Sequence, residues 1–421
     1  MVYWLRPLFY KMSSTRRYGN VRFSKADTDV KEKTTSSFRT RVMLASQHKV
    51  KLQVELAMEK SKRDTLLSQT FRPNKEEKVE EVELKDSGAD KSLSEDLREK
   101  ILEAAEKFSS RNGSETEFDF SGYGLGYEGI ASLFLTLPFD SPKLSKLDFS
   151  DCNLDARGLS VVYKILETNR DIRELNLSRN NVGQSGIDWV RKILQVCELR
   201  VLALADNGLS DKDMEDLMEV LPEAELLKEL DLSHNLLGLL SGTTLTRHLP
   251  GNHSLRRLNL SHNELGAEGL RRITEGLREN DTLERLDVSW NSLQDHGMVH
   301  VSDIILKAVS LKEIALNGNF ITVVGARHLA HSLRENSSLE VLEMGQNFLR
   351  NDGACALVRS VRSNGSSKLR LLDLNGTLVE KEFATIYRRI QLDNTTFQVT
   401  GFCVVGDDRV TSSRRENSKF K

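Results

Sequence analysis

The stretch Leu255-Arg-Arg-Leu258-Asn-Leu260-Ser-His-Asn263-Glu-Leu265 decides the fold of this chain. Leu258 and Leu260 alternate with polar neighbours, which predicts a short strand with one apolar side. Asn263 follows where the chain must turn, and its amide can satisfy backbone groups that no strand ladder reaches. One unit therefore consists of this strand and a following helix, whose apolar side carries Leu270, Ile273 and Leu277.

The same unit repeats through the second half of the chain with a period of about 28 residues. Six successive gaps between the turn asparagines measure 27, 28, 28, 28, 28 and 28 residues. Degenerate units extend the array, with Cys152 at the turn position on one side and Thr377 on the other. We therefore expect about ten stacked rungs, whose turns contain a buried amide ladder made by Asn180, Asn207, Asn235, Asn263, Asn291, Asn319 and Asn347.

This motif and its period closely resemble the ribonuclease-inhibitor type of leucine-rich repeat, over roughly residues 116–380. The resemblance implies an α/β solenoid, a horseshoe with parallel strands on its concave face and helices on its convex face. Ribonuclease inhibitor itself is a poor match, because that protein is cysteine-rich and strongly acidic. This chain has 4 cysteines and a formal net charge of -2. Proteins with this fold bind many different partners, so the resemblance predicts the architecture more strongly than the function.

Composition narrows the functional class. The chain carries 60 basic and 62 acidic residues, a balance that argues against nucleic acid as a partner. The cysteines show no CxxC spacing, which indicates reduced thiols in an intracellular protein. No apolar run approaches the roughly 20 residues of a membrane span. Walker-type, GxSxG, HExxH and paired metal-ligand motifs are absent from the sequence. We expect a monomeric, cytoplasmic protein that is not an enzyme and has no cofactor.

The residues before the repeats differ from them in composition. Residues 1–37 are basic and rich in serine and threonine, which predicts a disordered tail. A mitochondrial presequence or a membrane-surface helix is the alternative, because apolar residues near the start fall at helical spacing. Residues 38–70 favour a helical arm, and residues 71–91 form an acidic linker. Within 92–115, a capping box at Ser92 predicts a helix that covers the first rung.

The C-terminal side of the array is expected to be closed in a similar way. Residues 381–405 combine an amphipathic helix, which includes Phe383 and Ile390, with a final strand at 402–405. Together they would cap the last rung. Residues 406–421 are expected to be disordered.

Function should reside in the rows of side chains that the strands align on the concave face. The middle row contains acids and no base, which favours a basic or amide-rich partner, although Asp and Asn are common there in this repeat type. Trp290 lies at a strand-to-turn position and resembles an interface anchor, with packing on its own rung as the alternative. The candidate partner-binding residues are Trp290, Arg257, Arg285, His262, His234, Asp231 and Asp287.

His234 and His262 occupy equivalent positions one rung apart, so their imidazoles can meet across the ~4.8 Å between strands. A zinc site takes three or four ligands, and the nearby acids Asp231 and Asp287 point from a different row. We therefore interpret the two histidines as surface residues of the repeat and expect no metal site.

The function that these patterns favour is an intracellular scaffold that binds a protein partner on the concave face. One alternative is a structural component of the cytoskeleton, axoneme or cilium, since tropomodulin-like proteins also join a partly helical arm to leucine-rich repeats. A further alternative is a regulator such as a Ran GTPase-activating protein, which has the same repeat type. That family carries a long acidic tail, whereas this sequence ends in a mixed, slightly basic one.

Overall fold

The described part of the chain is the repeat region and its C-terminal extension. The computed structural model describes residues 99, 117–137, 139 and 144–405. The chain divides into two units, Met1–Leu84 and Lys85–Lys421, and every described residue belongs to the second. The expected basic tail, helical arm, acidic linker and C-terminal tail lie outside the described residues, as does the expected capping helix apart from Glu99.

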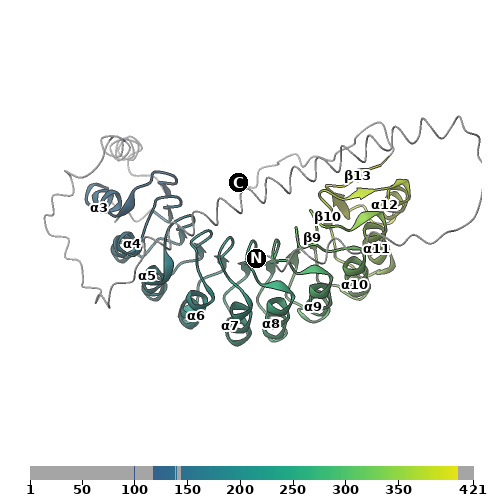
Figure 1. Cartoon of the computed structure of the whole chain (residues 1–421), viewed down its shortest axis with the longest axis horizontal. Helices are drawn as coiled ribbons and strands as arrows, with labels where there is room; N and C mark the ends of the chain where they lie inside the picture. The colour runs from purple at the N-terminus through teal and green to yellow at the C-terminus, as the bar shows by residue number, and fades with distance from the viewer. Residues whose placement is uncertain (1–98, 100–116, 138, 140–143, 406–421) are drawn as a thin grey trace, which may run out of the picture. The chain divides into compact units, whose positions relative to one another are not determined.

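Strands and helices alternate along the described residues, which confirms the α/β solenoid. One parallel sheet contains 11 strands, and its first ten follow sequence order. Figure 1 shows the strands on the inner side of an arc and the helices on its outer side. The strands of this sheet are β1 (Glu117–Asp119), β2 (Lys146–Asp148), β3 (Glu174–Asn176), β4 (Val201–Ala203), β5 (Glu229–Asp231), β6 (Arg257–Asn259), β7 (Arg285–Asp287), β8 (Glu313–Ala315), β9 (Val341–Glu343), β10 (Leu371–Asp373) and β12 (Gln398–Thr400).

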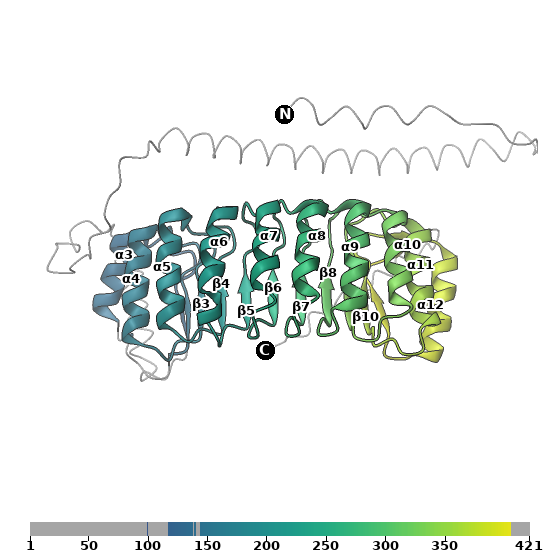
Figure 2. The ribbon, with the colours of Figure 1, turned by 90° about the horizontal axis from the view of Figure 1, so that it is seen from below.

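A helix follows nearly every strand and covers the convex side, where neighbouring helices lie side by side (Figure 2). Their apolar sides face the sheet, and Leu270, Ile273 and Leu277 are buried as the helical spacing predicts. The helices are α3 (Gly126–Thr136), α4 (Ala156–Thr168), α5 (Gly183–Val196), α6 (Asp211–Val220) with the 3-10 turn η3 (Leu221–Glu223), α7 (Leu239–His248), α8 (Gly266–Leu277), α9 (Gln294–Lys307), α10 (Val323–Leu333), α11 (Arg350–Ser363) and α12 (Lys381–Asp393).

Adjacent strands pair in the register that the repeat spacing predicts. Leu258 pairs with Leu286, and the polar residues Asn259 and Asp287 pair beside them. One strand position therefore forms one row across the sheet. The apolar residues that follow the strands are fully buried at six successive rungs: Leu177, Leu204, Leu232, Leu260, Val288 and Leu316.

The turn asparagines connect successive rungs. The Asn263 amide donates to the carbonyl oxygens of Leu232, on the preceding rung, and Leu260, on its own rung, each at 3.0 Å. Its side-chain oxygen accepts from the Leu237 N–H at 3.1 Å, again on the preceding rung. The same pattern places the amides of Asn291 and Asn319 fully inside the stack. Each turn is therefore satisfied by a side chain from the next repeat.

The rungs of β2 and β10 carry Cys152 and Thr377 in place of the turn asparagine. The Cys152 Sγ lies 3.0 Å from the carbonyl oxygen of Phe120, on the preceding rung. Burial raises the pKa of Cys152 to about 11, so the group stays a thiol that can donate. The buried hydroxyl of Thr377 finds no hydrogen-bond partner among the described residues. The stack thus tolerates a weaker donor at Cys152 and a hydroxyl at Thr377 that no described residue satisfies.

A second asparagine ladder, which the repeat motif did not predict, lies where helices return to strands. The Asn280 amide donates to the Leu249 carbonyl oxygen at 2.8 Å, and its oxygen accepts from the Leu283 N–H at 2.9 Å. The Asn336 amide donates to the Ile305 carbonyl oxygen at 2.7 Å. Both asparagines stand in Asn-x-Ser/Thr-Leu sequences, which also match the glycosylation sequon. Burial and these hydrogen bonds give the motif a structural role.

The C-terminal extension adds one strand more than the sequence predicted. A strand forms within 402–405 as β13 (Cys403–Val404), which pairs with β11 (Leu378–Val379) in a separate two-stranded sheet. The additional strand β12 joins the main sheet beside β10. It follows the fully buried Phe397 and lacks the leucine motif, so the repeat period could not reveal it. Among the described helices, none combines the length and apolar character that crossing a bilayer requires.

Candidate functional site

One row of residues runs along the edge of the sheet where the strands end. Each residue immediately precedes a turn position, and each has a positive φ, from 54° to 65°. Non-glycine residues adopt this left-handed conformation only at a cost, usually of about 1 kcal/mol or more. The row, called the turn row from here on, consists of Asp151, Arg179, Asp206, His234, His262, Trp290, Gly318 and Gln346.

Three turn-row residues form a continuous stack. The ring centroids of His234 and His262 lie 3.9 Å apart with an interplanar angle of 12°. The rings of His262 and Trp290 lie 5.3 Å apart with an angle of 13°. Both histidines are exposed and Trp290 is half-buried. Three rungs therefore present the edges of stacked rings side by side, an arrangement that offers apolar contact together with polar ring atoms.

The stack ends at Gly318, on the rung after Trp290. A β-carbon at Gly318 would lie 2.3 Å from Cδ2 of the indole, closer than any real contact allows. The indole therefore occupies the space that a side chain would need in the next rung. Gly318 is visible in the sequence, but its role depends on a neighbour 28 residues away.

The electrostatics of the stack favour the neutral form of His262. Although His262 is exposed as a whole, partial desolvation of its stacked imidazole, followed by the proximity of His234, lowers the pKa of His262 to about 4. The nitrogen lone pairs of parallel rings lie in the ring planes, so the two imidazoles do not converge on a single ion. The residues that the structure describes contain no group of three or more His, Cys, Asp or Glu side chains that could hold a metal.

A charge cluster lies on the concave strands β7 to β9. The Arg285 guanidinium contacts the carboxylates of Glu313 at 2.5 Å, Glu343 at 3.3 Å and Asp287 at 4.0 Å. Burial alone would lower the pKa of Arg285, but the bond to Glu313 and the nearby negative charges raise it. Burial raises the pKa of Asp287, against the lowering effect of its hydrogen bond from the Ser289 N–H. The acids of the middle row are thus partly neutralised by a base from the first row.

The remaining candidates have other partners. Arg257 pairs with Glu229 at 2.9 Å, on the neighbouring strand. Asp231 accepts the N–H of Ser233 at 2.9 Å and so closes its own turn. Equivalent middle-row residues make the same local hydrogen bond, namely Asp148, Asn176, Asn259 and Asp287. The structure therefore groups Trp290 with the two histidines and Arg285 with Asp287, while Arg257 and Asp231 contact neither group through an ion pair or hydrogen bond.

A second exposed aromatic pair was missed in the sequence. Phe320 and Phe348 are 51% and 58% exposed, and their ring centroids lie 6.2 Å apart. Each follows a turn asparagine, Asn319 or Asn347, directly in the chain. The available signal was a phenylalanine at one repeat position in two consecutive units, where other rungs mostly carry smaller or polar residues.

Comparison with known proteins supports the repeat type. The family model for the leucine-rich repeat matches residues 140–162, 168–188, 251–273 and 279–301. The chain is 33% identical over 129 residues to NACHT, LRR and PYD domains-containing protein 12 of Mus musculus, an alignment that covers 30% of this chain and 12% of that protein. It is 32% identical over 116 residues to ribonuclease inhibitor of Mus musculus, covering 27% of this chain and 25% of that protein.

The match to the human NACHT, LRR and PYD domains-containing protein 12 covers 38% of this chain and 15% of that protein, at 29% identity. The chain thus spans a quarter or less of the length of these relatives. Among solved structures, a chain from an octameric complex of Latrophilin 3, Unc5D and FLRT2 aligns over 70% of this chain and 86% of that chain. That alignment has 18% identity and a TM-score of 0.38, too weak a likeness to build on.

Proposed function

We propose that this chain, whose leucine-rich repeats resemble those of ribonuclease inhibitor, is an intracellular protein that binds a protein partner through the turn row. Leucine-rich repeat proteins generally mediate protein–protein interactions, and their curvature provides extended binding surfaces. The observation that carries the proposal is the stack of His234, His262 and Trp290. Trp290 is its anchor.

The stack suits a binding anchor because it is held in place before a partner arrives. The indole lies between the His262 ring and the backbone at Gly318, so binding would immobilise few additional bonds. Aromatic side chains with a polar edge are enriched at the energetic centres of interfaces. The complementary group on the partner is an apolar or planar side chain that can pack against the outward edges of the stacked rings.

The surroundings of the stack provide a polar rim. Arg179, Asp206 and Gln346, in the same row, are all exposed. Such residues hydrogen-bond and orient a partner without large desolvation cost. The proposal of an intracellular site rests on the cysteines: all four are unpaired thiols, and Cys152, Cys197 and Cys355 are buried.

The test compares two half-buried tryptophans in the full-length chain. Trp290 lies in the turn row, whereas Trp189 lies on the convex helix α5, where it contacts Tyr163. Partners captured by tagged wild-type protein are quantified by mass spectrometry against Trp290→Ala and Trp189→Ala. Binding of each purified partner is then measured by calorimetry.

We expect Trp290→Ala to weaken binding by about 2 kcal/mol, roughly 30-fold in Kd, and Trp189→Ala to leave it near the wild-type value. Melting curves of both variants control for folding. Equal binding by wild type and Trp290→Ala would assign Trp290 to packing and remove the turn row as the binding surface.

A further inference from the structure

Helices α9 and α10 are neighbours on the convex side (Figure 2). A groove lies between them. Its volume is about 690 Å³. Three apolar side chains on its walls are exposed: Val299 is 52% exposed, Leu306 43% and Val324 55%. Exposed apolar residues gathered in one groove indicate a contact surface more often than scattered ones do.

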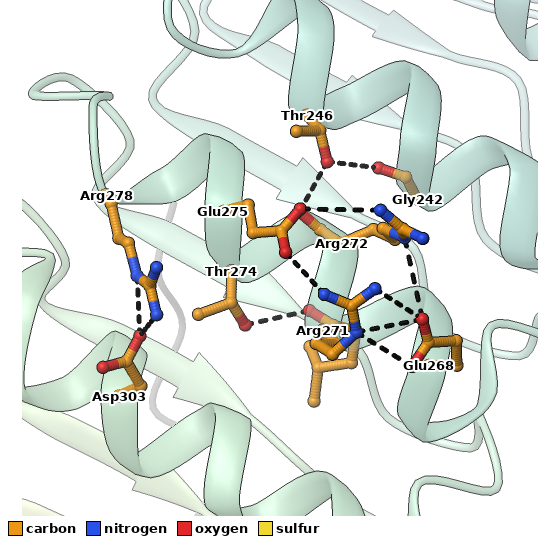
Figure 3. A network of polar contacts seen from close by, with 10 residues as sticks. Gly242, Thr246, Glu268, Arg271, Arg272, Thr274, Glu275, Arg278 and Asp303 are labelled. Carbon is orange, nitrogen blue, oxygen red and sulfur yellow. Dashed lines mark hydrogen bonds and ion pairs between the residues drawn. The ribbon is translucent and has the colours of Figure 1, made fainter.

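The charge of the groove is unbalanced. Asp303, which lines it, contacts Arg278 at 2.6 Å and Lys307 at 2.5 Å, so its negative charge is already countered. Figure 3 shows the Arg278–Asp303 pair at the edge of α8. Arg327, on α10, is exposed and has no ion-pair partner among the described residues. The exposed His331, one turn further along α10, adds imidazole donors on the same side.

On the adjacent helix, α8, the charged side chains pair with one another. On α8, the Arg271 guanidinium contacts Glu268 at 2.6 Å and Glu275 at 2.5 Å (Figure 3). Both carboxylates also lie within ion-pair distance of Arg272. Acids and bases therefore balance there, whereas Arg327 remains available to an external carboxylate. The buried Ser302 hydroxyl also lines the groove and has no hydrogen-bond partner among the described residues.

We propose that this groove docks an acidic protein segment that carries leucine-like side chains. Its apolar side chains would cover Val299, Leu306 and Val324, and its carboxylates would pair with Arg327 and accept a hydrogen bond from a ring N–H of His331. Charge complementarity selects an acidic partner, because the carboxylate of the groove is already engaged and its exposed arginine is not. The groove lies between convex helices and the turn row lies where the strands end, and they share no residue, so the inference is independent of the proposed function.

The test uses the full-length chain and a fluorescein-labelled amphipathic peptide of about 15 residues, with leucines at helical spacing and glutamates between them. Two control peptides replace all glutamates by glutamine or all leucines by serine. Arg327→Glu removes the cation, and Leu306→Ser removes an apolar wall. Arg389→Glu is the matched control, because Arg389 is an exposed arginine on the convex helix α12, outside the groove.

Fluorescence anisotropy should show binding of the acidic leucine peptide that falls about tenfold or more with Arg327→Glu and with Leu306→Ser. Arg389→Glu should stay close to the wild type, and both control peptides should bind weakly. Unchanged binding by Arg327→Glu and Leu306→Ser would overturn the proposal.

Two other outcomes would also overturn it. Full displacement of the peptide by inorganic phosphate alone, together with equal binding of the serine control peptide, would reduce the groove to a simple anion site. Self-association of the wild type that Arg327→Glu abolishes in sedimentation velocity would assign the groove to a second copy of the chain.

Discussion

The indole of Trp290 lies so close to Gly318 that a β-carbon there would fall 2.3 Å from Cδ2 of the ring. The two residues are turn-row neighbours on successive rungs. Elsewhere in that row, aspartate, arginine, histidine and glutamine adopt φ values of 54° to 58°. The left-handed backbone alone therefore does not require glycine at this position, and the tryptophan supplies the reason.

Gly318→Ala is expected to destabilise the protein more than Gly266→Ala does. Gly266 has a similar φ of +60° and no atom within 4 Å of its ideal β-carbon, so it isolates the conformational cost, about 1 kcal/mol. Gly318→Ala adds the collision with Trp290. In thermal unfolding, the double variant Gly318→Ala/Trp290→Ala should have a melting temperature near that of the Gly266→Ala variant. Equal melting temperatures for the two single glycine variants would show that the indole moves aside freely.

Asn291→Ala should lower the free energy of unfolding by about 1–3 kcal/mol. The fully buried amide donates to the Leu260 carbonyl oxygen at 2.8 Å, and its oxygen accepts from the Leu265 N–H at 3.2 Å, so alanine leaves both groups unsatisfied. Asn181→Ala, at the exposed position directly after the turn asparagine Asn180, is the control and should change little. A pair of indistinguishable denaturation curves would mean that water replaces the amide.

His262→Asn should make the protein more resistant to mild acid. In the folded state the pKa of His262 is lowered to about 4 from 6.5, mainly by burial and then by His234. The unfolded chain therefore takes up the proton first, and stability is lost as pH falls from about 6.5 towards 4. Asparagine tolerates the left-handed backbone and does not titrate. Melting temperatures should diverge in favour of the variant below pH 6, and parallel pH profiles would contradict this.

Asp287→Asn tests a group whose contribution to stability changes with pH in the opposite direction from that of His262. Burial raises the pKa of Asp287, so the folded state holds its proton more tightly than the unfolded state. The stabilisation from this group is present below its ordinary pKa of 3.8 and is lost as pH rises through the raised value. At neutral pH the variant should melt at or above the wild type, with the advantage disappearing in acid. Asp231→Asn controls for the swap, and an advantage that persists unchanged in acid would refute the interpretation.

The repeat period predicted the architecture because a single constraint acts on every rung. Leu258 and Asn263 recur at fixed spacing, and a residue type that recurs in this way must serve the stack itself. The second ladder at Asn280 and Asn336 was missed because the motif that carries it is also a glycosylation sequon. Strand β12 was missed because Phe397 and Val399 replace the leucine pattern.

The candidate surface was predicted only in outline. Spacing placed His234, His262 and Trp290 in one row, because residues one period apart become neighbours. It could not show that the rings stack, since that depends on the left-handed backbone and on the side-chain torsions. Nor could it show that Arg285 crosses from its own row to Asp287 and Glu343, because a long side chain is not confined to the row of its Cα atom.

The asparagine ladder sets the order in which the turns of the stack can be completed during synthesis. Asn263 donates to Leu232 and accepts from Leu237, and both belong to the repeat that precedes it in the chain. A turn is therefore completed by the repeat synthesised after it. A nascent chain that emerges with its N-terminus first holds its newest turn open until the next asparagine arrives. Folding during translation would then trail synthesis by one period, and a break at any rung would leave the turn before it unfinished.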